Sequence, residues 1–263
     1  TGWSMKEWVG KVYPDQTKAK DFLKHYARQF NTIELNATHY RIPNEATILK
    51  CKTETPDDFR FCPKIPQSVS HSRDLGLETG HLQRFCAMIA QLDRRLGCCF
   101  MQLPPYFGTD RLGMLERFLT HFPQHIPLAI ELRHESWFAD RNSADDLFQL
   151  LETHHMATVI TDVAGRRDVL HQRLTNNCAM LRFVGNALHS SDYERVDAWV
   201  QQFKDWIEQG LSNIYFFAHE PDNILSPDLA LYFKNQMEEH IEGLITRGPT
   251  FYQHPSDLQM RLF

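Results

Sequence analysis

Charged and amide side chains occur at the ends of several short apolar runs in this chain. Cations in such a set can hold a phosphate or a carboxylate, and Arg can do so through two parallel hydrogen bonds. A carboxylate or an amine whose pKa is tuned by neighbouring charges can act as an acid, a base or a nucleophile. We expect the catalytic groups to be Glu34, Lys64, Glu131, His134 and Asp162. We expect the substrate-contacting groups to be Asn36, Tyr40, Gln102, Arg133, Trp137 and Arg182.

Seven short β-type runs alternate with helical patterns along the chain. The β-type runs cover residues 31–36, 59–64, 97–103, 127–132, 157–162, 179–184 and 213–218. They begin about 30 residues apart, which is the length of one βα unit. The helical patterns cover residues 18–30, 45–53, 80–96, 111–121, 144–154, 192–209 and 227–240. The stretch 164–177 is polar and weakly periodic, so we expect it to lack a full helix.

This alternation predicts an α/β fold with a parallel sheet. An eighth strand would complete a TIM (β/α)8 barrel, and we expect that strand to precede Thr1, because residues 2–8 resemble the loop that follows a strand. A doubly wound open sheet is the alternative, but the chain has no GxGxxG motif and no P-loop. No linker divides the chain. We therefore expect one TIM-barrel domain over residues 1–240 and a C-terminal extension or tail over 241–263.

The alternation of apolar and polar residues predicts which face of each strand is which, because successive side chains point to opposite faces. Residues such as Ile33, Leu128, Val159 and Leu181 are assigned to the outer face, under the helices. The opposite set faces the barrel interior near the carboxyl ends of the strands, where TIM-barrel enzymes carry their sites. That set contains Glu34, Asn36, Lys64, Gln102, Glu131, Arg133, Asp162, Arg182 and His219. The alternative is that these groups form buried ion pairs with a structural role only.

Composition excludes several classes of protein. The chain is 42% hydrophobic and 23% charged and has a net charge of −5, values typical of a globular protein without broad affinity for nucleic acid. No apolar run approaches the length of a membrane span. The six Cys include no CxxC pair, so we expect free thiols in a reducing compartment and a cytoplasmic protein.

Several motifs resemble those of one family, in the same order along the chain. The N-terminal ones are Gly2-Trp3-Ser4 with Trp8 and Tyr13-Pro14, then Phe30-Asn31-Thr32-Ile33-Glu34-Leu35-Asn36 with Tyr40 and Pro43. The later ones are Phe59-Arg60-Phe61 through Lys64-Ile65-Pro66 with Ser70-His71, Phe100-Met101-Gln102-Leu103-Pro104-Pro105, and Glu131-Leu132-Arg133-His134 with Ser136-Trp137. By these motifs the chain resembles the DUF72 (YecE-like) family of TIM-barrel proteins.

The resemblance implies a TIM barrel and implies no activity, because the family has no established biochemical function. It covers about the first 165 residues and then weakens. The family usually carries Arg-Leu-His-Gly on its seventh strand, where this chain has Arg182-Phe183-Val184-Gly185. The family's Phe-Asn-Asn on the eighth strand is replaced by Phe217-Ala218-His219-Glu220. Ligand contacts made by those family groups are therefore in doubt here.

The function expected from these residues is an enzyme of hydrolase or lyase type that binds a small anionic substrate, phosphate preferred, without a cofactor. One alternative is a divalent-metal phosphodiesterase that processes DNA, with Glu131, Asp162, His219 and Glu220 as metal ligands. A retaining glycosidase is a further alternative, since it needs two neighbouring carboxylates.

The C-terminus suggests a function of a different class. Residues 259–263 resemble the bacterial sliding-clamp-binding peptide, in which Gln sets the orientation and apolar residues are anchors. The residues expected to bind the clamp are Gln259, Met260, Leu262 and Phe263. This pattern predicts a non-catalytic sliding-clamp-associated binding module, and clamp binding would mean that the barrel acts on DNA or at replication and repair sites. The alternative is that Leu262 and Phe263 fold back onto the barrel.

Overall fold

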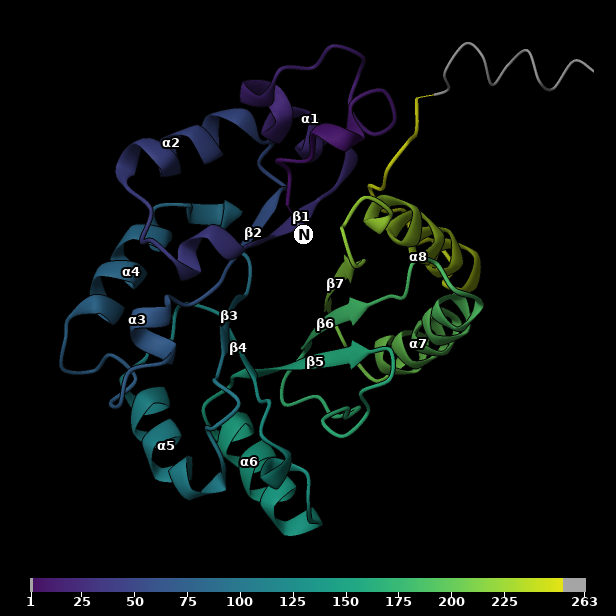
Figure 1. Cartoon of the computed structure of the whole chain (residues 1–263). Helices are drawn as coiled ribbons and strands as arrows, with labels where there is room; N and C mark the ends of the chain where they lie inside the picture. Colours follow the sequence, from purple (N-terminus) through teal and green to yellow (C-terminus); the bar gives the residue numbers. More distant parts are fainter. Residues whose placement is uncertain (1, 253–263) are drawn as a thin grey trace, which may run out of the picture.

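Parallel strands surrounded by helices make up the part of the chain that the computed structural model describes, residues 2–252 (Figure 1). The strands are β1 (Thr32–Leu35), β2 (Arg60–Pro63), β3 (Cys99–Gln102), β4 (Leu128–Glu131), β5 (Ala157–Val163), β6 (Cys178–Val184) and β7 (Asn213–His219). The helices are α1 (Phe22–Gln29), α2 (Glu45–Glu54), α3 (Gln67–Ser70), α4 (His81–Ala90), α5 (Leu112–His121), α6 (Arg141–Thr153), α7 (Ser190–Glu208) and α8 (Ser226–His240). The expected runs and helical patterns therefore all correspond to elements. Residues 164–177 contain no helix, as expected.

The strands follow one another in sequence order and are all parallel. β1 pairs with β2, and β3 to β7 form a second ladder in the order β3-β4-β5-β6-β7. Two isolated parallel bridges, Phe61 to Leu96 and Lys64 to Phe100, link the two ladders. Within residues 2–252 no ladder joins β1 to β7. The fold is thus α/β with parallel strands, and the closed eight-stranded barrel stays a prediction.

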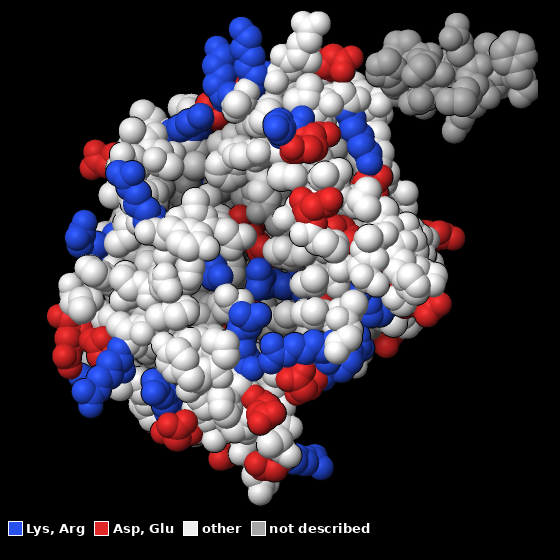
Figure 2. Space-filling view, in the orientation of Figure 1, with Lys and Arg blue, Asp and Glu red and all other residues white. Residues whose placement is uncertain are grey.

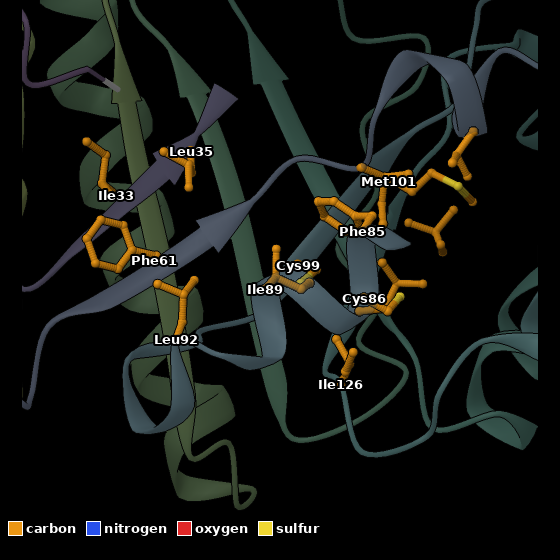
Figure 3. Close-up of a cluster of buried hydrophobic side chains, with 14 of the residues drawn as sticks. Ile33, Leu35, Phe61, Phe85, Cys86, Ile89, Leu92, Cys99, Met101 and Ile126 are labelled. Carbon is orange, nitrogen blue, oxygen red and sulfur yellow. The ribbon is translucent and has the colours of Figure 1, made fainter. Parts of the chain in front are cut away.

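The outer faces of the strands pack against the helices. Figure 3 shows Ile33 and Leu35 of β1 and Phe61 of β2 in one apolar cluster with Phe85 and Ile89 of α4. All five side chains are at most 5% exposed. The outward assignment made from the alternation in β1 and β2 is therefore confirmed. Burial of each such side chain stabilises the fold by about 1.5–3 kcal/mol.

The inner faces form a separate, smaller cluster. It includes Cys62 of β2, Phe100 of β3, Val159 of β5, Met180 of β6 and Phe217 of β7. These residues fill the space enclosed by the strands below the polar ends, so the interior is packed rather than open. Five of the six Cys are buried, and all six are free thiols.

The inward position of Val159 shows that the face assignment made for β5 was wrong. Val159 belongs to the inner cluster, whereas Ile160 packs outward with α7 and α8. Alternation did not decide between them because both residues are apolar, and a shift of one residue exchanges every side chain between the faces. Asp162 therefore points outward with Ile160.

Residues 241–252, expected to begin a tail, lie against the N-terminal part of the chain. Arg247 donates hydrogen bonds to the carbonyl oxygens of Ala27 and Phe30, and the backbone N–H of Thr250 donates to Gln29. Between this segment, α8, β7 and α1 lies a mostly apolar cavity of about 510 Å³. None of the expected site residues within 2–252 lines this cavity. No helix within the described residues is long and apolar enough to span a bilayer.

Candidate active site

An arginine between two glutamates forms the floor of the site. Arg182 on β6 places Nε 2.5 Å from Oε1 of Glu34 and Nη1 2.8 Å from Oε2 of Glu131. Both carboxylates are at most 1% exposed. They come from β1 and β4, so three distant parts of the sequence meet at the carboxyl ends of the strands. A buried charge is very costly without partners, and this arrangement supplies a partner to each one.

These contacts keep Glu34 and Arg182 charged. Burial by itself would raise the pKa of Glu34, but Arg182 and His219 outweigh it and hold the pKa well below the ordinary value. Burial would lower the pKa of Arg182, and the two glutamates raise it instead. His219 lies with Nε2 2.9 Å from Oε2 of Glu34. Its pKa is nevertheless lowered, chiefly by burial, so its ring is neutral near pH 7.

A chain of hydrogen bonds leads from the floor to Lys64. The amide nitrogen of Gln102 donates to Glu131 at 2.6 Å, and Nζ of Lys64 donates to the amide oxygen of Gln102 at 2.8 Å. Since the Gln102 amide must donate on one side and accept on the other, its orientation is fixed by Glu131. No carboxylate among the described residues lies within 4 Å of Nζ of Lys64. Burial and the charge of Arg182 lower the pKa of Lys64.

Two more polar groups border this floor. Nε of Arg133 lies 3.6 Å from Oε1 of Glu131, and the side chain is 38% exposed. The amide nitrogen of Asn36 donates to Oε2 of Glu34 at 3.4 Å. Figure 2 shows Lys and Arg side chains gathered beside a central hollow of the surface, with acidic atoms deeper inside it. We call the group Glu34, Asn36, Lys64, Gln102, Glu131, Arg133 and Arg182 the mouth.

Asp162 does not belong to the mouth. It lies on the outer face of β5, 1% exposed, where it accepts hydrogen bonds from Arg195 at 2.7 Å, from Arg167 at 2.8 Å and from the indole N–H of Trp199 at 2.7 Å. Its oxygens are thus occupied by α7 and by the loop after β5. The prediction that Asp162 faces inward as a catalytic group is wrong, because β5 has the opposite register.

His134 and Trp137 support the loop after β4. Nδ1 of His134 accepts the backbone N–H of Ser136 and lies 2.8 Å from its hydroxyl oxygen. Trp137 is fully buried and donates its indole N–H to the carbonyl of Phe107 at 2.7 Å. No face of Trp137 is therefore open to a ligand, in contrast to the expected substrate contact. Tyr40, by comparison, is 82% exposed at the rim beside the mouth.

The four residues proposed as metal ligands lie in different surroundings. Glu131 is paired with Arg182, Asp162 faces α7, and His219 contacts Glu34. Glu220 accepts the backbone N–H of Ala187 at 2.8 Å. Within residues 2–252 no three His, Cys, Asp or Glu side chains gather in a way that could hold a metal ion. This geometry gives the metal alternative no support.

Sequence reasoning missed Thr161. It pairs in register with Arg182 and therefore shares the inner face of the strands with it. Its hydroxyl oxygen is buried and has no hydrogen-bond partner among the described residues. The signal in the sequence was the alternation through residues 157, 159, 161 and 163 of β5, which places Thr161 on the inner face. The expected clamp-binding residues Gln259, Met260, Leu262 and Phe263 lie outside the described residues.

Comparison with known proteins gives one consistent result. The family profile described as "Protein of unknown function DUF72" matches residues 1–254. UPF0759 protein YecE of Escherichia coli (strain K12) is 30% identical over 245 residues, which cover 86% of this chain and 87% of YecE. UPF0759 protein YunF of Bacillus subtilis (strain 168) is 29% identical over 146 residues, which cover 53% of this chain and 51% of YunF.

The fold agrees with that result. A crystal structure of a DUF72 family protein from Enterococcus faecalis V583 superposes with a TM-score of 0.75 at 17% identity. The superposition covers 95% of this chain and 96% of that one. The resemblance inferred from the motifs is thus confirmed over nearly the whole length, including the second half where the motifs weaken. The chain belongs to the DUF72 family of proteins of unknown function.

Proposed function

We propose that the mouth binds the anionic group of a small molecule, phosphate preferred over carboxylate, and that the protein is an enzyme acting on that molecule. The observation that carries the proposal is Lys64. Its ammonium group stands at the end of a hydrogen-bond chain that fixes its position, and no carboxylate in the part of the chain that the structure describes lies within 4 Å of it. A half-buried cation without a counter-charge is costly, and an anionic ligand would remove that cost.

The charge balance of the mouth supports the same conclusion. Three cations, Lys64, Arg133 and Arg182, face two carboxylates, and Arg182 already neutralises much of the charge on both. Arg133 is held loosely, at 3.6 Å from Glu131, so its guanidinium keeps donors available for a ligand. Lys64 and Arg133 would therefore supply the contacts to the anion, and Arg182 would hold the floor in place.

The same groups limit the chemistry that the site can perform. The Glu34 carboxylate stays ionised because its pKa is lowered, so it is poorly suited to be a general acid. The lowered pKa of Lys64 makes its ammonium group a better proton donor, which suits transfer of a proton to an oxygen of the bound substrate. Glu131 and Gln102 would orient that ammonium group. Hydrolase or lyase chemistry on an anionic substrate fits this set of groups.

Phosphate binding tests the proposal directly. We expect inorganic phosphate, titrated by calorimetry and by ³¹P NMR, to bind the parent protein and to bind Lys64→Met at least about tenfold more weakly. Lys50→Met is the matched control, because Lys50 lies on α2 with its side chain 53% exposed and outside the mouth. Arg133→Met should weaken binding by a smaller factor. Equal phosphate affinity of the parent, Lys64→Met and Arg133→Met would overturn the proposal.

A further inference from the structure

A second pocket of about 470 Å³ opens at the rim next to the mouth. It lies between η3 (Asn36–His39), which follows β1, and α3 (Gln67–Ser70), which follows β2. Its walls include His39, Tyr40 and His71. The two imidazole rings meet edge to face with centroids 5.6 Å apart, and the Tyr40 ring stands 5.3 Å from that of His39. We call this the rim pocket.

The rim pocket is joined to the mouth by two short segments. Asn36, the first residue of η3, contacts Glu34 in the mouth, and His39, the last, lines the pocket. Lys64 stands at the end of β2, and Pro66, two residues later, lines the pocket. The hydroxyl of Thr38 lies within 2.7 Å of the carbonyl oxygens of both Leu35 and Lys64, so the two segments are tied together. The rim pocket and the mouth are therefore built on the same two segments, those that follow β1 and β2.

The hydrogen bonds of the two histidines determine the tautomer of His39 and allow an assignment for His71. Nδ1 of His39 lies 3.0 Å from the carbonyl oxygen of Ile65, and because a carbonyl only accepts, Nδ1 must donate. The hydroxyl of Ser70 donates to the carbonyl of Pro66 at 3.3 Å. With the Ser70 proton assigned to this carbonyl, the Ser70 oxygen accepts from Nδ1 of His71 at 2.9 Å, and Nδ1 of His71 is assigned the ring proton as well.

Both rings are neutral near pH 7. Burial and the charge of Lys64 lower the pKa of His39, and burial, His39 and Lys64 lower the pKa of His71. A neutral imidazole that donates through Nδ1 has a lone pair on Nε2. The rim pocket thus contains two hydrogen-bond acceptors beside an exposed aromatic ring. Arg41 also lines it, as an exposed cation at its edge.

We infer that the rim pocket is a second subsite for the same ligand, and that it takes a planar ring bearing N–H donors while the phosphate lies at Lys64 and Arg133. This inference rests on the proposed function, and it narrows the substrate class to a nucleoside monophosphate or a similar phosphorylated heterocycle. A ring with N–H donors satisfies the two Nε2 acceptors, and its face can stack on Tyr40. A second anionic group in the rim pocket would instead face the lone pairs on Nε2 of the two histidines, which would repel it.

A comparison of three probes tests this subsite. Adenosine 5′-monophosphate, ribose 5-phosphate and inorganic phosphate are titrated into the parent protein by calorimetry near neutral pH. We expect the nucleotide to bind at least about tenfold more tightly than ribose 5-phosphate. His71→Phe keeps an aromatic ring but removes the hydrogen-bond acceptor. It should lower the affinity for the nucleotide to the value for ribose 5-phosphate and leave the affinity for ribose 5-phosphate unchanged. Tyr40→Ala should act in the same direction.

The matched control is His121→Phe. His121 lies on α5, and its Nδ1 also contacts a backbone carbonyl oxygen, that of Arg117. This variant should change none of the three affinities. Equal affinity of the nucleotide and ribose 5-phosphate, with phosphate binding still dependent on Lys64, would overturn the subsite and leave the proposed function standing. Binding of adenosine that is lost in His71→Phe, together with no phosphate binding, would overturn the proposed function and leave the subsite standing. If none of the probes binds, both are wrong.

Discussion

Two buried arginines, each between two carboxylates, invite a direct comparison. Arg182 lies between Glu34 and Glu131 at the mouth, and Arg195 lies between Asp162 and Asp192 on the outer face. Both arginine side chains are 14% exposed, and all four carboxylates are at most 1% exposed. By burial and pairing alone, the two clusters are indistinguishable.

Their surroundings differ. Around Arg195, Nη2 also donates to the carbonyl of Val184, the centroid of the Phe183 ring lies 4.1 Å from the guanidinium, and Trp199 donates to Asp162, although Nε of Arg195 has no hydrogen-bond partner among the described residues. The mouth instead contains Lys64, which has an amide partner but no carboxylate within 4 Å among residues 2–252. Buried ion pairs are therefore weak evidence of function by themselves. A neighbouring cation with unused capacity is the more informative signal.

The largest expected effect is on stability, and it should be similar in both clusters. Arg182→Met and Arg195→Met each leave two buried carboxylates without their common partner, which should lower the free energy of unfolding by about 3–5 kcal/mol. Guanidinium chloride unfolding followed by circular dichroism measures this. A loss below about 1 kcal/mol in either variant would contradict the view that both arginines are structural to the same degree.

Phosphate binding should then distinguish the cluster around Arg182 from the cluster around Arg195. Asp162→Asn should leave phosphate affinity within about twofold of the parent, because Asp162 faces α7. Glu131→Gln should change phosphate affinity by more than that, since it releases Gln102 and with it the position of Lys64. Calorimetric titration of folded protein, checked by circular dichroism, gives both values. A larger change in Asp162→Asn than in Glu131→Gln would place the site on the wrong face.

A smaller effect is expected on the acid dependence of stability. The pKa of Glu34 is lower in the folded protein than its ordinary value of 4.5, so the folded state binds fewer protons than the unfolded state in this range. The resulting stability is present above pH 4.5 and is lost as the pH falls through the folded pKa. Denaturant unfolding of the parent below pH 4.5 should therefore show a steeper decline than that of Glu34→Gln. Parallel declines would mean that Arg182 does not hold Glu34 ionised.

The smallest effect on the folded protein is expected from the C-terminus. Deletion of residues 259–263 should leave phosphate affinity and the unfolding midpoint unchanged. If the sliding-clamp interpretation is correct, the same deletion removes binding to a purified bacterial clamp in surface plasmon resonance. Glu131→Gln is the matched control, because it alters the mouth and keeps the C-terminal residues. Clamp binding that is absent in the parent, or that persists after the deletion, would overturn the interpretation.

Most of the candidate site could be predicted from the sequence, and Asp162 shows where such prediction fails. In β1 the alternation is unambiguous, since Ile33 and Leu35 flank Glu34, and Glu34 lies where expected. In β5 the residues from 157 to 160 offer an apolar side chain on both faces, so polarity could not choose the register. The packing of Ile160 under α7 and of Val159 among the inner residues decided it.

The sequence by itself determined the order of strands and helices, the family and the polar groups at the strand ends, because these follow from local periodicity and from motifs. Only the tertiary structure decided which of these groups meet. Glu34 and Arg182 are 148 residues apart in the sequence, and nothing local indicates that one guanidinium serves both Glu34 and Glu131. Nor could the sequence reveal that Lys64 is left without a counter-charge. Pairing depends on where the strands bring side chains in space, and that is set by the packing of the whole sheet.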